Sequence, residues 1–270
     1  MSGGPRKFHA LFLSDLHLGT RGCQADRLLD FLRLHDADLI YLAGDIVDGW
    51  QLRSGWYWPQ SHNDVVQKIL RKAHKGARVI YVPGNHDEFL RDYYGTHLGG
   101  IEVSETAIHE ACDGRRYLVI HGDHFDMVVK HARWLAYLGD YAYTTALIAN
   151  RIFNAARRAF GFPYWSLSQW LKLKVKNAVS YITAFEGALA HEAKRRGFDG
   201  VICGHIHKAE IREIDGITYC NDGDWVESLT ALVEMSDGTL KIIDWRAIEA
   251  LRRGEHVPQL GEAIAHPAGD

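Results

Sequence analysis

Short apolar, β-prone runs alternate with amphipathic segments along the first third of the chain. Apolar runs at 8–13, 39–43 and 79–82 have the length of buried strands. Between them, apolar residues recur at helical spacing at 24–35 and again at 65–73. An alternation of strand, helix and strand is typical of βαβ units, so this part of the chain predicts a largely parallel sheet.

Later β-prone pieces are joined by Asp-Gly turns. Such turns lie at Asp113-Gly114, Asp215-Gly216 and Asp237-Gly238, each between two apolar runs, which favours β-hairpins. Val201 to Cys203 is a further strand-like run. Parallel units followed by hairpins predict an α/β fold in which two mixed sheets pack together with helices outside them.

Residues 127–196 carry no strand pattern. The stretch is rich in alanine, leucine, aromatic and basic residues, and Gly161 and Pro163 interrupt it. We interpret it as a helical insertion over a functional site, that is, a lid or a substrate-recognition element. Ordinary helical packing against the sheets would give the same pattern. Residues 250–270 turn polar and are expected to form a loosely held tail, which leaves residues 1–249 as the main domain.

Composition narrows the class of protein. The chain has 270 residues and a formal net charge of −3, so no global basic character indicates a nucleic-acid partner. The four cysteines form no CxxC pair, which favours reduced thiols over disulfides or a zinc ribbon. The sequence shows no signal-peptide pattern and no run of about 18 uncharged apolar residues. We therefore expect a soluble cytoplasmic protein, with peripheral contact with the inner membrane left open.

Five short segments at the ends of the strand-like runs carry aspartate, asparagine and histidine. They are Asp15-Leu16-His17, Gly44-Asp45-Ile46-Val47-Asp48, Gly84-Asn85-His86-Asp87, His121-Gly122-Asp123 and Gly204-His205-Ile206-His207. Their N and O donors suit divalent Mn, Fe, Zn or Mg. Taken alone, the DxH, GD and HGD segments are weak signals, whereas GNHD and GHxH after strand-like runs are moderately specific. Together, in this order and each at the end of a strand, they predict a two-metal hydrolase of a phosphate ester or anhydride.

Two metal ions about 3.5–4 Å apart solve a specific chemical problem. They neutralise the anionic phosphate, lower the pKa of a bridging water and hold its attack in line. Such a site needs one carboxylate that bridges both ions, and Asp45, which leaves a strand at a glycine, is the expected bridge. Asp15 and His17 are two residues apart, as are His205 and His207, and in extended geometry such side chains point the same way.

The ordered set D-x-H, GDxxD, GNHD, HGD and GHxH resembles the calcineurin-like metallophosphoesterase superfamily over residues 8 to about 245. The resemblance implies a four-layer α-β-β-α sandwich of two mixed sheets and a bridging hydroxide as the nucleophile. It implies that one metal is held by Asp15, His17, Asp45 and His207, and the other by Asp45, Asn85, His121 and His205.

The same resemblance assigns roles to two residues that are not ligands. His86 corresponds to the histidine that contacts the phosphate and protonates the leaving oxygen. Asp48 corresponds to the acidic residue that orients this histidine, although a helix N-cap or turn residue would fit its position too. Asp123 and His124 could support the site or belong to an ordinary loop. The late loop at 221–224 could face the site or form a plain turn.

Within the superfamily, the chain resembles the UDP-2,3-diacylglucosamine hydrolases of lipid A synthesis, which cut a nucleotide-lipid pyrophosphate and release UMP. The similarity rests on residues 13–18, on residues 44–50 and on the insertion after 121–123. That subfamily carries arginine at the position of His86 and glutamate at the position of Asp48, so at these two positions the chain follows the wider superfamily.

The insertion contains residues suited to a large amphiphilic substrate. Aromatic and aliphatic residues between 134 and 148 could line an acyl groove or touch a membrane. Basic residues that could meet phosphates or anionic headgroups are Arg151, Arg157, Arg158, Lys172, Lys174 and Lys176. A helical hairpin with a buried apolar face and a solvated basic face would carry the same residues.

We therefore expect a hydrolase with two divalent ions, manganese foremost, that acts on a nucleotide-linked lipid or a related pyrophosphate. The alternative is a phosphodiesterase or phosphatase for a cyclic nucleotide, a glycerophosphodiester or a phosphoprotein. A nucleic-acid substrate is disfavoured by the near-neutral composition and the apolar insertion. A non-catalytic scaffold is a third hypothesis, against which the complete ligand set argues. The sequence does not determine the oligomeric state.

Overall fold

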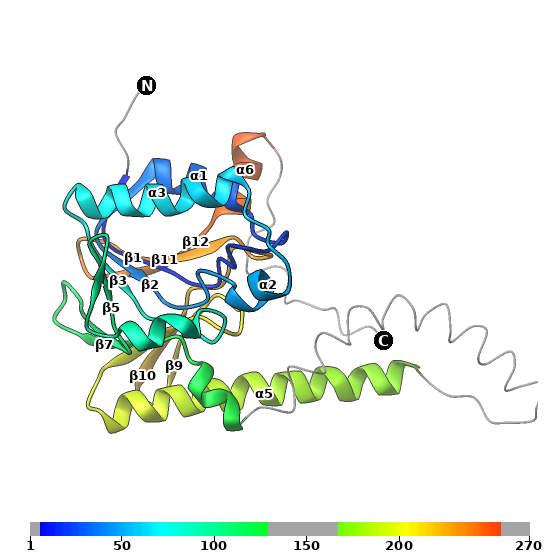
Figure 1. Ribbon diagram of the computed structural model, residues 1–270. Coiled ribbons are helices and arrows are strands. Elements are labelled where there is room, and N and C mark those ends of the chain that lie inside the picture. Colours follow the sequence, from blue (N-terminus) through cyan, green and yellow to red (C-terminus); the bar gives the residue numbers. More distant parts are fainter. Residues whose placement is uncertain (1–5, 129–166, 255–270) are drawn as a thin grey trace, which may run out of the picture. The chain divides into compact units, whose positions relative to one another are not determined.

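The computed structural model describes residues 6–128 and 167–254 (Figure 1). The chain divides into two compact units, one formed by residues 1–122 and 193–270 and the other by residues 123–192. The first unit contains both β-sheets and all seven predicted metal ligands. The second contains most of α5 (Leu167–Arg195), which lies within the expected insertion.

The first sheet has seven strands in the order β12-β11-β1-β2-β3-β5-β4. Its strands are β1 (Arg6–Leu13), β2 (His35–Leu42), β3 (Arg78–Tyr81), β4 (His97–Leu98), β5 (Ile101–Val103), β11 (Thr230–Glu234) and β12 (Leu240–Asp244). Strands β1, β2, β3 and β5 are parallel, as the βαβ pattern predicts, whereas β4, β11 and β12 pair antiparallel.

The second sheet has five strands in the order β6-β7-β8-β10-β9. Its strands are β6 (Ala107–Glu110), β7 (Arg116–Val119), β8 (Gly200–Cys203), β9 (Glu210–Ile214) and β10 (Ile217–Asn221). The three predicted hairpins are confirmed, since β6–β7, β9–β10 and β11–β12 are antiparallel pairs. The expected α/β fold with two mixed sheets is therefore confirmed.

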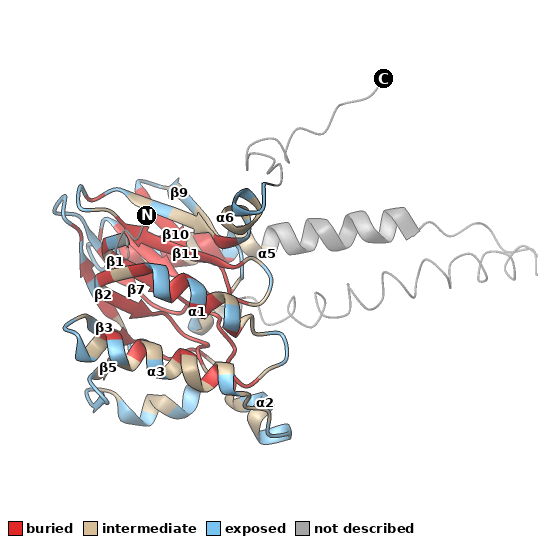
Figure 2. Ribbon diagram, turned by 90° about the horizontal axis from the view of Figure 1, so that it is seen from above, coloured by how far each residue is buried: buried red, intermediate tan, exposed pale blue. Residues whose placement is uncertain are grey.

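Strand β1 shows how the sheets and helices pack. Successive side chains of a strand point to opposite faces. Leu11 belongs to the core that includes apolar residues of α1 (Ala25–Leu34) and α3 (Gln60–His74). Phe12 belongs to a second core shared with Tyr117 of the other sheet. The first sheet thus lies between helices and the second sheet, and Figure 2 shows its central strands β1, β2 and β11 as mostly buried while the outward sides of α1 and α3 are exposed.

Several elements differ from the predicted ones. Strand β2 starts at His35, before the apolar run at 39–43, because Arg6 of β1 pairs with His35. Short helices that the periodicity did not predict are α2 (Gly49–Ser54), η1 (Glu88–Tyr93), η2 (Asp123–Val128) and α6 (Trp245–Arg252). Helices of one or two turns have too few residues to show a 3.6-residue period.

The proposed division into main domain, insertion and tail stays a prediction. Residues 129–166 and 255–270 lie outside the described residues, and with them lie Gly161, Pro163 and most of the tail. Helix α6 runs across residue 249, where the tail was expected to begin. None of the described helices combines the length and the apolar character needed to cross a bilayer.

Candidate metal centre

The predicted ligands follow the carboxyl ends of strands from both sheets. Asp15 follows β1, Asp45 follows β2 and Asn85 follows β3 in the first sheet, while His121 follows β7 and His205 follows β8 in the second. Parallel neighbours end on the same edge of a sheet, where α/β proteins commonly bind their ligands. The five ligand segments therefore lie where side chains from both sheets can meet.

The backbone turns sharply at most of these ligands. Five of them have φ angles between 50° and 73°, namely Asp15, His17, Asp45, His205 and His207. Residues other than glycine seldom adopt this left-handed conformation, and such strain concentrates at functional sites. The idea that extended geometry aligns each pair two residues apart is therefore wrong. A turned backbone, in which the Asp15 amide donates to the Gly44 carbonyl at 3.0 Å, brings the side chains together.

One group of ligands comprises Asp15, His17 and His207. One ligand atom from each lies within 4.8 Å of the others. His207 Nε2 lies 3.0 Å from Asp15 Oδ1, and His17 Nε2 lies 3.7 Å from the same oxygen. His17 Nε2 is buried and makes no hydrogen bond in the described structure. These three residues fit one divalent ion.

A second group comprises Asp45, His121 and His205, again with ligand atoms within 4.8 Å of one another. His121 Nε2 lies 3.3 Å from Asp45 Oδ2 and 3.2 Å from His205 Nδ1. His121 Nδ1 lies 2.8 Å from the Ala43 carbonyl. Because that carbonyl can only accept, Nδ1 carries a proton, and Nε2 is the ring atom left to bind a metal ion, the arrangement typical of a metal-binding histidine.

Asp45 lies between the two groups. Its carboxylate also clusters with His17 and His86 within 4.8 Å, so it adjoins ligands of both groups, as a bridge requires. Oδ1 accepts from the His86 amide at 2.8 Å, and Oδ2 is buried without a hydrogen bond in the described structure.

Asn85 carries a buried amide in which neither Oδ1 nor Nδ2 has a hydrogen-bond partner in the described structure. An unsatisfied buried polar group costs about 1–3 kcal/mol, and a metal ion would satisfy the amide oxygen. The donors present therefore fit two divalent ions.

The electrostatics also favour cations. Burial alone would raise the pKa of Asp45, but the neighbouring His121 outweighs it and the pKa falls to about 2. Burial would lower the pKa of His17, yet Asp15 and Asp48 raise it to about 10. The negative carboxylates thus hold protons on nearby histidines, and divalent ions would displace those protons on binding.

Asp48 uses its two oxygens for different tasks. Oδ2 lies 2.9 Å from His86 Nδ1 and 3.1 Å from His17 Nδ1. Oδ1 accepts from the Gln51 amide at 2.8 Å and caps α2. Burial would raise the pKa of Asp48, but His17 and His86 hold it below its ordinary value. Both interpretations of this residue from the sequence, the helix cap and the partner of His86, match its contacts.

Asp87 is a supporting residue to which the sequence analysis assigned no role. Its Oδ1 accepts from the Gly84 amide at 2.5 Å, and its Oδ2 accepts from the Ile46 amide at 2.7 Å and from the Tyr81 hydroxyl at 2.5 Å. Asp87 thereby joins the loop that carries Asn85 to the loop that carries Asp45. The feature of the sequence that could have indicated this role is the position of Asp87 within the GNHD segment.

Part of the late loop at 221–224 supports the site through hydrogen bonds to residues next to the ligands. Asn221 Nδ2 donates to the Gly204 carbonyl at 2.6 Å, next to His205. Ser14 Oγ lies 2.6 Å from both Asp15 Oδ2 and Asp222 Oδ1. Asp224 instead accepts from backbone amides of the following turn. The loop thus contains both a support for the site and an ordinary turn.

Other predicted residues lie in the second unit or outside the described residues. Asp123 begins η2, and the His124 side chain is exposed. Lys172, Lys174 and Lys176 lie on α5. Arg151, Arg157 and Arg158 fall outside the described residues. The contacts of these basic residues with substrate stay predictions, and so does a supporting role for Asp123 and His124.

Comparison with known proteins places these features in context. The model of the calcineurin-like phosphoesterase family matches residues 8–209, a range that includes every predicted ligand. UDP-2,3-diacylglucosamine hydrolase of Porphyromonas gingivalis is 24% identical over 266 residues, covering 86% of this chain and 95% of that protein. The enzyme of the same name from Neisseria meningitidis serogroup B is 24% identical over 244 residues, covering 86% and 96%. A solved archaeal phosphodiesterase shares 14% identity at a TM-score of 0.43, covering 87% of this chain and 98% of that chain.

Proposed function

The chain belongs to the calcineurin-like phosphoesterase family and is a metal-dependent phosphoester hydrolase, and from this premise we propose that it cleaves a phosphate diester or pyrophosphate with two divalent ions. The observation that carries the proposal is the position of Asp45, whose carboxylate adjoins ligands of both groups. Manganese is the proposed metal, because the donors are all N and O atoms and include two carboxylates and an amide.

When bound, the two ions supply activated water and neutralise the phosphate oxygens. Asp15, Asp45 and Asn85 would hold them from one sheet, and the histidines that follow β7 and β8 from the other. His86 is suited to meet the phosphate, because Asp48 lies 2.9 Å from its Nδ1 while its Nε2 lies 3.9 Å from Asp45 Oδ2. In this position its ring can donate a proton to the leaving oxygen.

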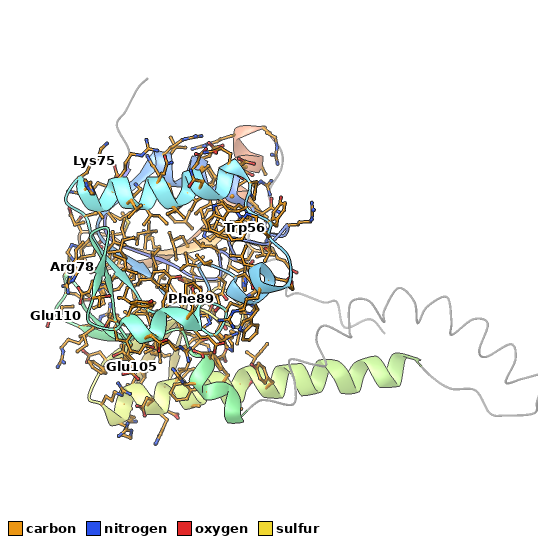
Figure 3. All side chains as sticks on the ribbon, in the orientation of Figure 1. Trp56, Lys75, Arg78, Phe89, Glu105 and Glu110 are labelled. Carbon is orange, nitrogen blue, oxygen red and sulfur yellow. The ribbon has the colours of Figure 1, made fainter. Side chains whose placement is uncertain are left out.

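We propose a nucleotide-linked lipid as the substrate. The similarity to UDP-2,3-diacylglucosamine hydrolases extends over 86% of the chain, which supports this substrate class. An exposed aromatic side chain beside the centre supports it too: Trp50 is 45% exposed, and its ring centroid lies 4.2 Å from that of His86. Two further exposed rings belong to the same part of the chain (Figure 3): Phe89 lies close to Gly49, the first residue of α2, and Trp56 follows the end of α2. Such rings can contact a base or an acyl chain.

A substrate panel tests this proposal. The Mn²⁺-loaded protein would be assayed with UDP-2,3-diacylglucosamine, with a UDP-sugar that lacks acyl chains, and with a chromogenic phosphodiester. We expect UMP release and the highest kcat/KM with the acylated substrate. Equal or better turnover of the phosphodiester would reject the lipid and favour the alternative of another diester. No turnover of any substrate would favour the non-catalytic scaffold.

Two variants separate metal binding from proton transfer. Asn85→Ala should lose one metal together with activity, whereas His86→Ala should keep both metals while kcat falls by about 10²–10⁴-fold. Metal content measured by mass spectrometry is the readout besides activity. Full turnover of Asn85→Ala would refute the assignment of the second metal. Loss of metal in step with activity in His86→Ala would refute its separate role.

A further inference from the structure

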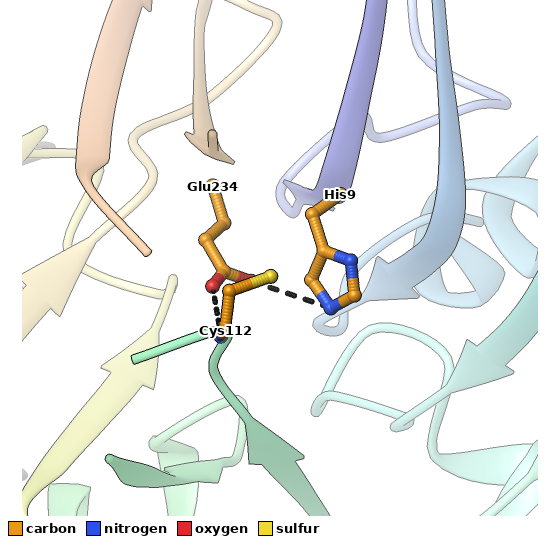
Figure 4. Close-up of side chains that lie close together, drawn as sticks. All are labelled: His9, Cys112 and Glu234. Atoms are coloured by element: carbon orange, nitrogen blue, oxygen red, sulfur yellow. Dashed lines mark hydrogen bonds and ion pairs between the residues drawn. The ribbon is translucent and has the colours of Figure 1, made fainter. Parts of the chain in front are cut away.

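Three side chains converge at a place distant from the metal centre: His9, Cys112 and Glu234 (Figure 4). His9 is in β1, four residues before the strand ends at Leu13, about 13 Å along the strand from the end that carries Asp15. Glu234 ends β11, next to β1 in the first sheet, and Cys112 lies in the turn between β6 and β7 of the second sheet. The cluster therefore joins the two sheets.

The distances suit a small metal ion. One donor atom of each residue lies within 4.8 Å of the other two, and His9 Nε2 lies 3.8 Å from Glu234 Oε2. Zinc bonds of about 2.0–2.3 Å place tetrahedral ligand atoms roughly 3.3–3.8 Å apart, so a small contraction would complete the geometry. A thiolate, an imidazole and a carboxylate are the donors that zinc takes, with one position left for water.

Hydrogen bonds hold the carboxylate of Glu234 within the cluster. Glu234 is fully buried. Its Oε1 accepts from the Cys112 amide at 2.7 Å, and its Oε2 lies 2.8 Å from Nε2 of the buried His109. Hydrogen bonds of this kind orient metal ligands in known sites.

The surroundings of Glu234 suit a cation. Among the described residues its ion-pair neighbours are His9 and His109, with no lysine or arginine. A buried carboxylate is costly unless it is paired. The His9 side chain is 30% exposed and Cys112 is exposed, so an ion can enter from solvent.

We propose that His9, Cys112 and Glu234 form a third metal site, separate from the binuclear centre, that binds a thiol-seeking divalent ion such as Zn²⁺. The thiol would release its proton to solvent as the ion binds. The bound ion would connect β1 and β11 of the first sheet to the β6–β7 turn of the second.

Cobalt spectroscopy tests this site independently of phosphoesterase activity. Co²⁺ bound to a thiolate gives a charge-transfer band in the near ultraviolet, and the binuclear centre, which has only N and O donors, gives none. We expect such a band when the reduced full-length protein is titrated with Co²⁺. Cys112→Ser should abolish the band without changing turnover, and His9→Ala should weaken Co²⁺ binding at this site by at least tenfold.

Cys23→Ser is the matched control, because Cys23 is a partly buried thiol outside the cluster, and it should retain the band. The proposal is overturned if wild-type protein shows no band at Co²⁺ concentrations that fill the binuclear centre, or if the band persists in Cys112→Ser. Since the readout is thiolate ligation, the outcome does not depend on whether the proposed substrate is right.

Discussion

Single residues in this protein serve more than one neighbour, and Asp48 is the clearest case. Its Oδ1 caps α2 through the Gln51 amide, while its Oδ2 lies close to both His17 and His86. Motif analysis cannot separate these functions, because a cap and a histidine partner call for the same side chain at the same place. Substitutions that remove one function at a time can separate them.

We predict that Asp48→Asn keeps the helix cap but loses the negative charge beside His86. Asparagine caps helices about as well as aspartate, whereas alanine at a cap costs about 0.5–2 kcal/mol. Asp48→Asn should therefore lower kcat at least tenfold, and it should lower the midpoint of urea unfolding by less than Asp48→Ala does, because it keeps the cap and loses only the charge that His17 and His86 stabilise. Asp48→Ala should lower both. If Asp48→Asn has wild-type kcat, Asp48 acts only as a cap.

His62 gives a prediction about pH. Its Nδ1 accepts from the Gly19 amide at 3.0 Å, and burial lowers its pKa. The unfolded chain, with an ordinary pKa of about 6.5, therefore binds a proton first as the pH falls. The free energy of unfolding therefore has its full contribution from His62 at pH 7. It falls progressively below about pH 6.5, by at most about 1.4 kcal/mol per pH unit.

The measurement compares wild-type protein with His62→Gln, which keeps an acceptor but does not titrate. Urea unfolding at pH 7, 6 and 5 should show a shallower pH dependence in the variant, since every other titrating group is common to both proteins. Parallel curves would contradict the prediction, because they would mean that the pKa of His62 is the same in the folded and the unfolded protein.

At the scale of elements, the loops after the strands pack so tightly that they leave no room for a side chain at Gly84. A Cβ at Gly84 would lie 2.3 Å from Asp45 Oδ1 and 2.6 Å from His121 Cδ2. The glycine that follows β3 is therefore needed for the close approach of the loops that carry Asp45 and His121.

We predict that Gly84→Ala displaces these ligands, lowers the metal content and lowers kcat/KM by about 10²-fold, the cost of a displacement of about 1 Å in an active site. Gly55→Ala is the matched control, because Gly55 has an extended backbone and no atom within 4 Å of an added Cβ. Metal analysis and kinetics of both variants check the prediction. A Gly84→Ala variant that keeps its metals and its activity would show that the loops can move apart freely.

At the scale of the molecule, the centre joins both sheets, since its ligands follow strands of each. Metal ions bound there should stabilise the folded unit. One ion at a hundredfold excess over its Kd contributes about 2.7 kcal/mol, which corresponds to a rise in Tm of about 5–10 °C.

Differential scanning calorimetry of chelator-treated protein, with and without Mn²⁺, checks this expectation. Asn85→Ala should show a smaller rise than the wild type, and Cys112→Ser should show the full rise, because its thiol lies outside the centre. A Tm that does not respond to Mn²⁺ would contradict a metal centre that links the sheets.

The sequence alone determined most of the strands, the longer helices and the residue types of the centre. Apolar runs of four to six residues become strands, because burial on both faces of a parallel sheet requires continuous apolar sequence. The placement of Asp15, Asp45 and Asn85 directly after such runs predicted their common location, since parallel strands end on one edge.

Only the tertiary structure decided how these residues meet. Periodicity reports local burial, so it is silent on the left-handed backbone at Asp15 and Asp45, which depends on hydrogen bonds between loops. It is equally silent on contacts across the sheets, where His9, Cys112 and Glu234 come together from three distant parts of the chain. Such contacts arise when two sheets pack face to face, and no short stretch of sequence encodes them.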